Sequence, residues 1–164
     1  MADSEEEKIA RDYIESGKAN ATLVIVDATL LERNLNLVFQ IMNLTKNVIV
    51  CVNLLDEAKK KGISVNLDKL SQILGVPVVG TIARKKKTLK DLISTISNVC
   101  NGNLDFSPNT IDIPLNDNKE FLDKVFEKAN EIVSKVVTVK NEDYNERDKK
   151  IDKILTSKSL VFLL

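Results

Sequence analysis

The chain contains no histidine, which excludes a histidine metal site, a Ser-His catalytic triad and imidazole acid–base catalysis. It has only 2 cysteines, too few for a disulfide framework. Cys51 lies in an apolar run and Cys100 late in a predicted helix, so we expect two buried, reduced thiols. Neither charge dominates, with Lys+Arg 24 against Asp+Glu 24, and nothing indicates nucleic acid as a partner.

Long apolar runs are also lacking. The first residues are acidic and polar, unlike a signal peptide. The apolar end at 160–164 is far shorter than the roughly 20 residues that cross a bilayer. A chain of 164 residues, 43% hydrophobic and 29% charged, is typical of one globular domain, or of one domain with a small appendage.

Three apolar runs, at 21–26, 47–53 and 76–80, alternate with helical patterns. Side chains that cap helices precede these patterns, at Ser4, Thr29, Asn66 and Thr88. The helical residues expected to face inward are Leu31, Leu35, Val38, Met42, Leu67, Leu70, Ile73, Leu89, Leu92, Ile93, Ile96 and Val99. The alternation predicts an α/β fold with three parallel strands and right-handed crossovers.

The pattern changes after about residue 101, where a polar linker runs to Pro114. A long helix is predicted from Asp117, and a further helix near 143–157. The apolar residues of the long helix, at three–four spacing, are Phe121, Leu122, Val125, Phe126, Ala129, Ile132, Val133, Val136 and Val137. Such a wide stripe must pack on itself or on the sheet.

The most informative polar residues follow the run at 47–52. Asn53 and Asp56 stand at the carboxyl end of a predicted parallel strand, where open α/β sheets bind ligands. A carboxylate there can accept hydrogen bonds from the ring N–H and exocyclic amine of guanine, and the Asn53 amide can bond its Hoogsteen edge. The same two residues would also suit a simple turn and helix cap, and that alternative stays open.

A second loop, Thr81, Ile82 and Ala83, follows the strand at 76–80. Two loops in this order, each after a strand, are typical of the base-reading end of guanine-nucleotide proteins. The Gly17-Lys18 pair does not supply a phosphate loop, because it follows a helix and precedes a strand, the reverse of the order needed. Asp27 ends a strand as a receiver phospho-acceptor does, but no acidic cluster accompanies it, so helix capping is preferred.

Several segments carry a resemblance to a known family. They are 5–14, 26–35, 53–58, 74–79 and 152–158. Together they resemble the ferrous iron transport protein B family, over nearly the whole chain. In that family a cytosolic G domain and a helical domain precede an iron-conducting membrane region, so the resemblance implies a place at the cytosolic face of the bacterial inner membrane.

The resemblance implies a partial P-loop NTPase-like (G-protein) three-layer fold with three parallel strands, followed by a small all-helical domain. Residues 1–104 would be the C-terminal portion of the G domain, 105–158 the helical domain, and 159–164 a stub before the first membrane span. The ligand implied is GTP or GDP.

By the same resemblance, Asn53 and Asp56 are the guanine-reading pair, and the Ala83 backbone N–H donates to the guanine carbonyl oxygen. Leu54 fits the family's habit of an apolar residue after the Asn. Thr81 and Ile82 complete the second loop. The family commonly has Ser where Ile82 stands, and this departure puts in doubt the hydrogen bonds that brace the loop.

The family's phosphate loop, switch threonine and Asp-x-x-Gly turn all belong before residue 1. We therefore expect Mg²⁺ only in the intact protein, and no GTP hydrolysis by this chain alone. Charge-assisted hydrogen bonds contribute roughly 1.5–3 kcal/mol each. Losing three would weaken nucleotide binding by roughly 10³- to 10⁶-fold.

The expected partners are the missing half of the G domain and the membrane pore of the same transporter. Without that half, the strand at 21–26 exposes its edge, which predicts low stability and self-association. An alternative function is a nucleotide-incompetent remnant that acts as a non-enzymatic interaction module. A stand-alone flavodoxin- or receiver-like domain would explain the strands but not the long helical tail.

Overall fold

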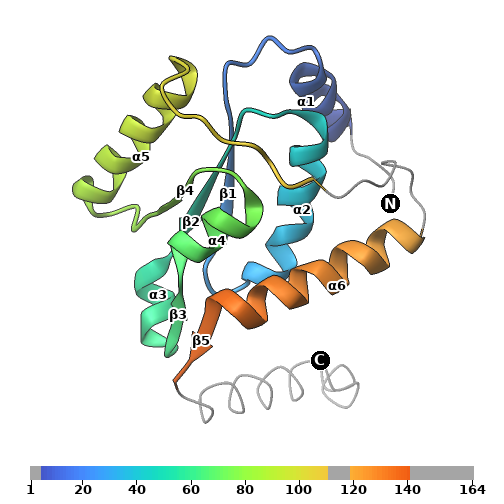
Figure 1. The fold of residues 1–164 in the computed structure, drawn as a ribbon. Helices are drawn as coiled ribbons and strands as arrows, with labels where there is room; N and C mark the ends of the chain where they lie inside the picture. The colour runs from blue at the N-terminus through green and yellow to red at the C-terminus, as the bar shows by residue number, and fades with distance from the viewer. Residues whose placement is uncertain (1–4, 111–118, 141–164) are drawn as a thin grey trace, which may run out of the picture.

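The computed structural model describes residues 5–110 and 119–140 (Figure 1). In chain order the elements are α1 (Glu5–Glu15), β1 (Thr22–Asp27), α2 (Leu31–Leu44), β2 (Val48–Asn53), α3 (Leu55–Lys60), β3 (Ile63–Val65), α4 (Leu67–Leu74), β4 (Val78–Gly80), α5 (Lys86–Cys100), α6 (Lys119–Val136) and β5 (Val137–Val139). The predicted helix near 143–157 and the stub at 159–164 lie outside the described residues.

The main sheet has three parallel strands in the order β1-β2-β4, which confirms the predicted α/β fold. β2 is the central strand, and its residues from Val48 to Val52 are all buried. That burial explains why β2 reads as a continuous apolar run. The register pairs Asp27 with Asn53 and Val52 with Gly80, so the carboxyl ends of the strands lie side by side.

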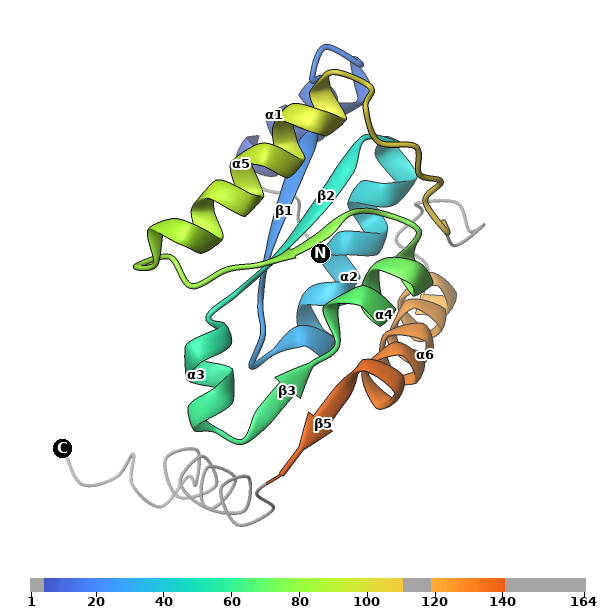
Figure 2. The ribbon, with the colours of Figure 1, turned by 60° about the vertical axis from the view of Figure 1, so that its left-hand side comes forward.

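Helices cover both faces of this sheet. In Figure 2, α5 lies on one side, and α2 lies on the other with α6 beyond it. β1 directs Val24 and Val26 into the core, while Ile25 between them is 59% exposed. The exposed Ile25 lies on a strand with one neighbour, β2, in the described part of the chain.

The long helix α6 shares its core with the sheet. The stripe predicted from the sequence is buried at Val125, Ala129, Ile132 and Val136, and these residues pack in one cluster with α2 and the strands. Phe126, predicted on the same stripe, is instead 54% exposed. Only a narrow part of the wide apolar stripe on α6 is therefore buried, where α6 packs against α2 and α4.

A second, antiparallel sheet joins the tail to the α/β part. β3 pairs with β5, with Val65 opposite Val137. Further backbone bonds flank this pair, from Asn66 N to Val136 O at 2.8 Å and from Lys140 N to Gly62 O at 2.9 Å. These two short strands were not predicted, and they anchor the end of α6 next to α4.

The polar linker also packs on the sheet domain. Asn109 donates from its backbone N–H to Leu74 O and from its side-chain amide to Ile73 O, both at 2.9 Å. These bonds satisfy carbonyls at the C-terminal end of α4, which would otherwise lack partners. Phe106, in the same linker, packs partly buried against the core.

Of the predicted helix caps that fall on described residues, one is present in the structure. The Asn66 cap is confirmed, because its side chain accepts from Lys69 N at 3.0 Å. The Thr29 and Thr88 caps are wrong, since α2 and α5 begin after Leu30 and Lys85, without a side-chain cap. Ser4 lies outside the described residues.

Two predictions of burial on α5 are also wrong. Ile93 is 65% exposed although it was expected inward. Cys100 is exposed, and only Cys51 is a buried thiol.

Within 5–110 and 119–140, no helix combines the length and apolarity needed to cross a membrane.

Candidate functional site

The two predicted loops meet at the carboxyl ends of β2 and β4. Thr81 N donates to Val52 O at 2.8 Å, and Leu55 N donates to Thr81 O at 3.4 Å. The Thr81 hydroxyl donates to Asn53 Oδ1 at 3.0 Å. The structure therefore brings Asn53 and Thr81, which are 28 residues apart in sequence, into direct contact.

Thr81 joins the two loops from the interior. It is only 2% exposed, and its hydroxyl oxygen also lies 3.2 Å from Cys51 Sγ. Because Asn53 Oδ1 accepts from Thr81, the amide is oriented with its Nδ2 amine as the group left for a ligand. That amine donates no hydrogen bond within the described part of the chain.

Leu54 makes the turn between β2 and α3. Its φ of 61° lies in the left-handed region, and among the described residues it is the only non-glycine with a positive φ. Leucine in this region is strained by roughly 1–2 kcal/mol. The turn allows α3 to begin at Leu55, which places Asp56 in its first turn and directs its carboxylate toward the second loop.

Asp56 forms an ion pair across the two loops. Its Oδ2 accepts from the Arg84 guanidinium, and the Asp56 side chain is 18% exposed while that of Arg84 is 68% exposed. A carboxylate this sheltered needs a partner, because burial without one is costly. In this structure its partner is Arg84.

The second loop is braced by Thr88, a role that the sequence did not reveal. The Thr88 hydroxyl accepts from Ile82 N at 3.1 Å and lies 2.9 Å from Lys85 O and 3.1 Å from Ile82 O, either of which can accept its proton. The bracing that the change from Ser to Ile82 put in doubt is present in the structure, and Thr88 supplies it. The Ala83 N–H has no hydrogen-bond partner within 5–110 and 119–140.

Replacing Thr88 with valine removes this brace while keeping the shape of the side chain. We expect the free energy of unfolding to fall by about 1–2 kcal/mol, because the part-buried Ile82 N–H loses its acceptor. Hydrogen exchange at the Ile82 amide should accelerate in the same variant. Thr95→Val is the matched control, because the Thr95 hydroxyl bonds only Asp91 O within α5. Unchanged protection at Ile82 would contradict the brace.

Asp27 serves the local backbone. Its Oδ1 accepts from Thr29 N at 2.7 Å, in the turn that leads from β1 into α2. This bond closes a turn before the helix, so the expected helix cap at Asp27 is wrong, since α2 begins after Leu30 without a side-chain cap. Within the described ranges, no group of three or more Cys, Asp and Glu side chains is arranged to hold a metal ion.

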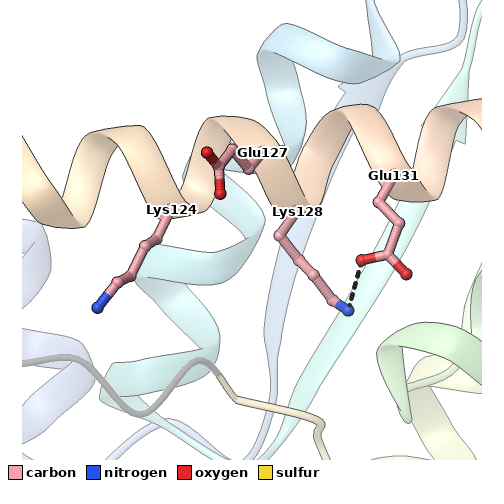
Figure 3. Close-up of a pocket in the computed structure, with 4 residues that line it drawn as sticks. All are labelled: Lys124, Glu127, Lys128 and Glu131. Atoms are coloured by element: carbon pink, nitrogen blue, oxygen red, sulfur yellow. Dashed lines mark hydrogen bonds and ion pairs between the residues drawn. The ribbon is translucent and has the colours of Figure 1, made fainter.

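A charged hollow lies along α6, away from both loops (Figure 3). It is lined by Lys124, Glu127, Lys128 and Glu131. Glu131 pairs with Lys128 at 2.9 Å and with Lys135 at 2.6 Å. Hydrogen bonds first from Lys135 and then from Lys128 lower the pKa of Glu131 to about 2. The hollow is lined by charged side chains of one helix, as is typical of a solvated helix face.

Comparisons with known proteins place the chain in a family. A sequence model described as Ferrous iron transport protein B matches residues 1–96. The Fe(2+) transporter FeoB of Helicobacter pylori (strain J99) is 38% identical over 154 residues, covering 92% of this chain and 24% of the relative. The chain thus spans about a quarter of the length of that relative.

Solved structures agree with this relationship. The FeoB G-domain from Methanococcus jannaschii is 44% identical, with a TM-score of 0.58 over 62% of this chain and 63% of its own. NFeoB from S. thermophilus, solved bound to mGMPPNP, is 40% identical, with a TM-score of 0.54 over 60% of this chain and 38% of its own.

A parallel α/β sheet that resembles these G domains defines the class of the protein. The chain belongs to the ferrous iron transport protein B family and matches its N-terminal, G-domain region. The predicted resemblance to this family is therefore confirmed as to the family.

Proposed function

We propose that this chain recognises the guanine base of GTP or GDP as part of the cytosolic G domain of a ferrous iron transporter. The observation that carries the proposal is the contact between the two loops, made by the Thr81 hydroxyl and Asn53 Oδ1 at 3.0 Å. The same two loops carry the Asn53 amide amine, the Asp56 carboxylate and the Ala83 backbone N–H, and we propose that these three groups surround one base. Each of these three groups matches one part of a guanine ring.

The roles follow from the donors and acceptors of guanine. Its N7 and O6 are acceptors, so the Asn53 amine would donate to N7 and the Ala83 N–H to O6. Its N1–H and N2 amine are donors, so the Asp56 carboxylate would accept from both. Leu54, Thr81 and Ile82 would shape the two loops without reading the base. Adenine would present an acceptor at N1 and no amine at C2, so it could not donate to Asp56 and would be rejected.

The wider assignment draws on the relatives. Residues 1–104 would form the C-terminal portion of a G domain, and 105–158 a helical domain that relays nucleotide state to the membrane pore. The structure of the S. thermophilus relative with mGMPPNP supports a guanine nucleotide as ligand. We propose that phosphates and Mg²⁺ are held by other parts of the intact transporter, at the cytosolic face of the bacterial inner membrane, and that these residues alone do not hydrolyse GTP.

We also propose that the open edge of β1 accepts another strand. In the described part of the chain β1 pairs only with β2, which leaves one row of backbone donors and acceptors for a partner. The partner would be the other half of the G domain in the intact protein, or a second copy of this chain when the chain is alone.

One observation favours the alternative function, a nucleotide-incompetent interaction module. The carboxylate that should accept from guanine is already paired with Arg84. If that pair is permanent, the site is closed and the loops serve only the fold. Substitution of Asp56 separates the two functions.

Asp56→Asn is expected to change the base preference from guanine to xanthine. In wild type, the Asp56 carboxylate would accept from the C2 amine of guanine. In the Asp56→Asn variant, the side-chain amide would instead donate to the C2 carbonyl of xanthine. We expect wild type to prefer GDP over XDP, and the variant to reverse this preference by about tenfold or more, since a matched bidentate pair is worth roughly 1–3 kcal/mol against the wrong base.

The measurement is a titration with each nucleotide at up to millimolar concentration, followed by NMR. Glu57→Gln is the matched control, because it removes one carboxylate charge from the neighbouring residue, which pairs with Lys60 instead. Equal, negligible binding of both nucleotides by wild type and Asp56→Asn would reject guanine recognition and leave the interaction module.

A further inference from the structure

The ion pair between Arg84 and Asp56 occupies the carboxylate that guanine would use. The Arg84 Nη2 amine donates to Asp56 Oδ2, and the two residues belong to the two loops of the proposed site. The Asp56 side chain is 18% exposed, so it offers little room for a second partner beside Arg84. A base that enters here must therefore take the place of the guanidinium.

Arg84 and guanine present the same chemistry to a carboxylate. A guanidinium carries N–H donors on a planar N–C–N unit. The N1–H and N2 amine of guanine form a similar planar N–C–N edge with donors in the same arrangement. Each can bond both oxygens of a carboxylate, so the two compete for Asp56.

The loop is built so that the side chain, and not the backbone, would move. Lys85 N donates to Ile82 O at 2.7 Å, and the Thr88 hydroxyl braces the same turn. The Arg84 side chain, by contrast, is 68% exposed and can swing into water. The Ala83 N–H beside it would keep its place for guanine O6 while Arg84 leaves.

We infer that Arg84 competes with the guanine base for Asp56. It is a specificity-determining residue that occupies the Asp56 carboxylate when the site is empty and thereby weakens guanine binding. This inference rests on the proposed function. Arg84 bonds one oxygen of the carboxylate with a donor of the kind that guanine presents, so a ligand that donates to both oxygens can displace it.

The expected size of the effect is modest. An exposed ion pair contributes a small free energy, so removing the competitor should tighten guanine binding about two- to fivefold. Added salt screens the pair, so the advantage of the variant should shrink as ionic strength rises.

The test is a GDP titration of the full chain, followed by NMR, for wild type, Arg84→Ala and the control Lys87→Ala. Lys87 is an exposed cation in the first turn of α5 and carries the same charge. We expect tighter binding by Arg84→Ala and unchanged or weaker binding by Lys87→Ala. Unchanged or weaker binding by Arg84→Ala would overturn the inference, because Arg84 would then not compete with the base.

A second measurement follows Arg84 itself. Its guanidinium ¹⁵N–H resonances should be protected from exchange in the free protein, exposed in Asp56→Asn, and exposed in wild type saturated with GDP. Persistent protection at saturation would overturn the inference.

The two failures are distinguishable. If wild type binds GDP and Asp56→Ala does not, the proposed function stands whatever Arg84→Ala does. If neither wild type nor Asp56→Ala binds, the proposed function fails and the inference fails with it.

Discussion

Replacing Gly75 with alanine is expected to lower the free energy of unfolding by about 2–5 kcal/mol. Gly75 ends α4 with a φ of +69°, and a Cβ built there would lie 2.0 Å from the backbone oxygen of Ser107. The left-handed conformation costs alanine roughly 1–2 kcal/mol. Relief of the clash requires the linker to shift, and overpacking of this kind costs about 1–3 kcal/mol more. Urea denaturation at neutral pH measures the sum.

Gly102→Ala is the matched control for this prediction. Gly102 has the same φ of +69°, but nothing lies within 4 Å of a Cβ built on it. Its substitution should cost only the conformational part, roughly 1–2 kcal/mol. Equal losses in the two variants would contradict the account, because they would mean that the linker is not held against α4 by Ser107 and Asn109.

Replacing Ile132 with alanine is expected to cost about 2–5 kcal/mol, the usual range for a fully buried isoleucine. Ile132 is 1% exposed and lies in the cluster that α6 shares with α2 and the sheet. The whole chain should unfold in one transition, at a lower urea concentration than wild type, because α6 completes the core of the α/β part. Far-UV circular dichroism and tyrosine fluorescence should report the same midpoint.

Phe126→Ala is the control on the same helix. Phe126 is larger than Ile132 but 54% exposed, so its removal should change stability by no more than about 1 kcal/mol. A stability loss in Phe126→Ala equal to that of Ile132→Ala would show that the assigned face of α6 is wrong. Two separate transitions in wild type would show that α6 folds independently of the sheet.

The main sheet could be predicted from the sequence because burial on both faces leaves a continuous apolar run. That holds for β2, in which every residue from Val48 to Val52 is buried. The short strands β3 and β5 could not be predicted. Each spans 3 residues, and β5 continues the apolar stripe of α6, so it carries no separate pattern. Their pairing depends on a contact between distant parts of the chain.

Residue spacing alone also misplaced some side chains. Ile93 and Phe126 fit the helical period, but no described element covers them. The helical repeat of apolar residues predicts which of them lie on the same side of a helix. How many of these residues are buried depends on the width of the element that packs against that side. The Thr88 hydroxyl was predicted as a helix cap because α5 was expected to begin there, but α5 begins at Lys86 and the hydroxyl bonds the preceding loop.

The position of the candidate site followed from topology. Parallel neighbouring strands end at one edge of a sheet, so Asn53 and Thr81 had to lie close together once β2 and β4 were neighbours. The ion pair between Arg84 and Asp56 did not follow, because it depends on the path of the loop after Thr81 and on a side-chain rotamer. These are three-dimensional properties that no local pattern records.

The most direct test of guanine recognition is NMR chemical-shift mapping with GDP on the full chain. We expect saturable shifts of the backbone amides of residues 53–56 and 81–84, together and with one dissociation constant. Asp56→Ala should lose them while its remaining spectrum stays that of a folded protein. Saturable shifts confined to other parts of the chain, or none in wild type at millimolar GDP, would contradict the claim that these two loops form one base-binding site.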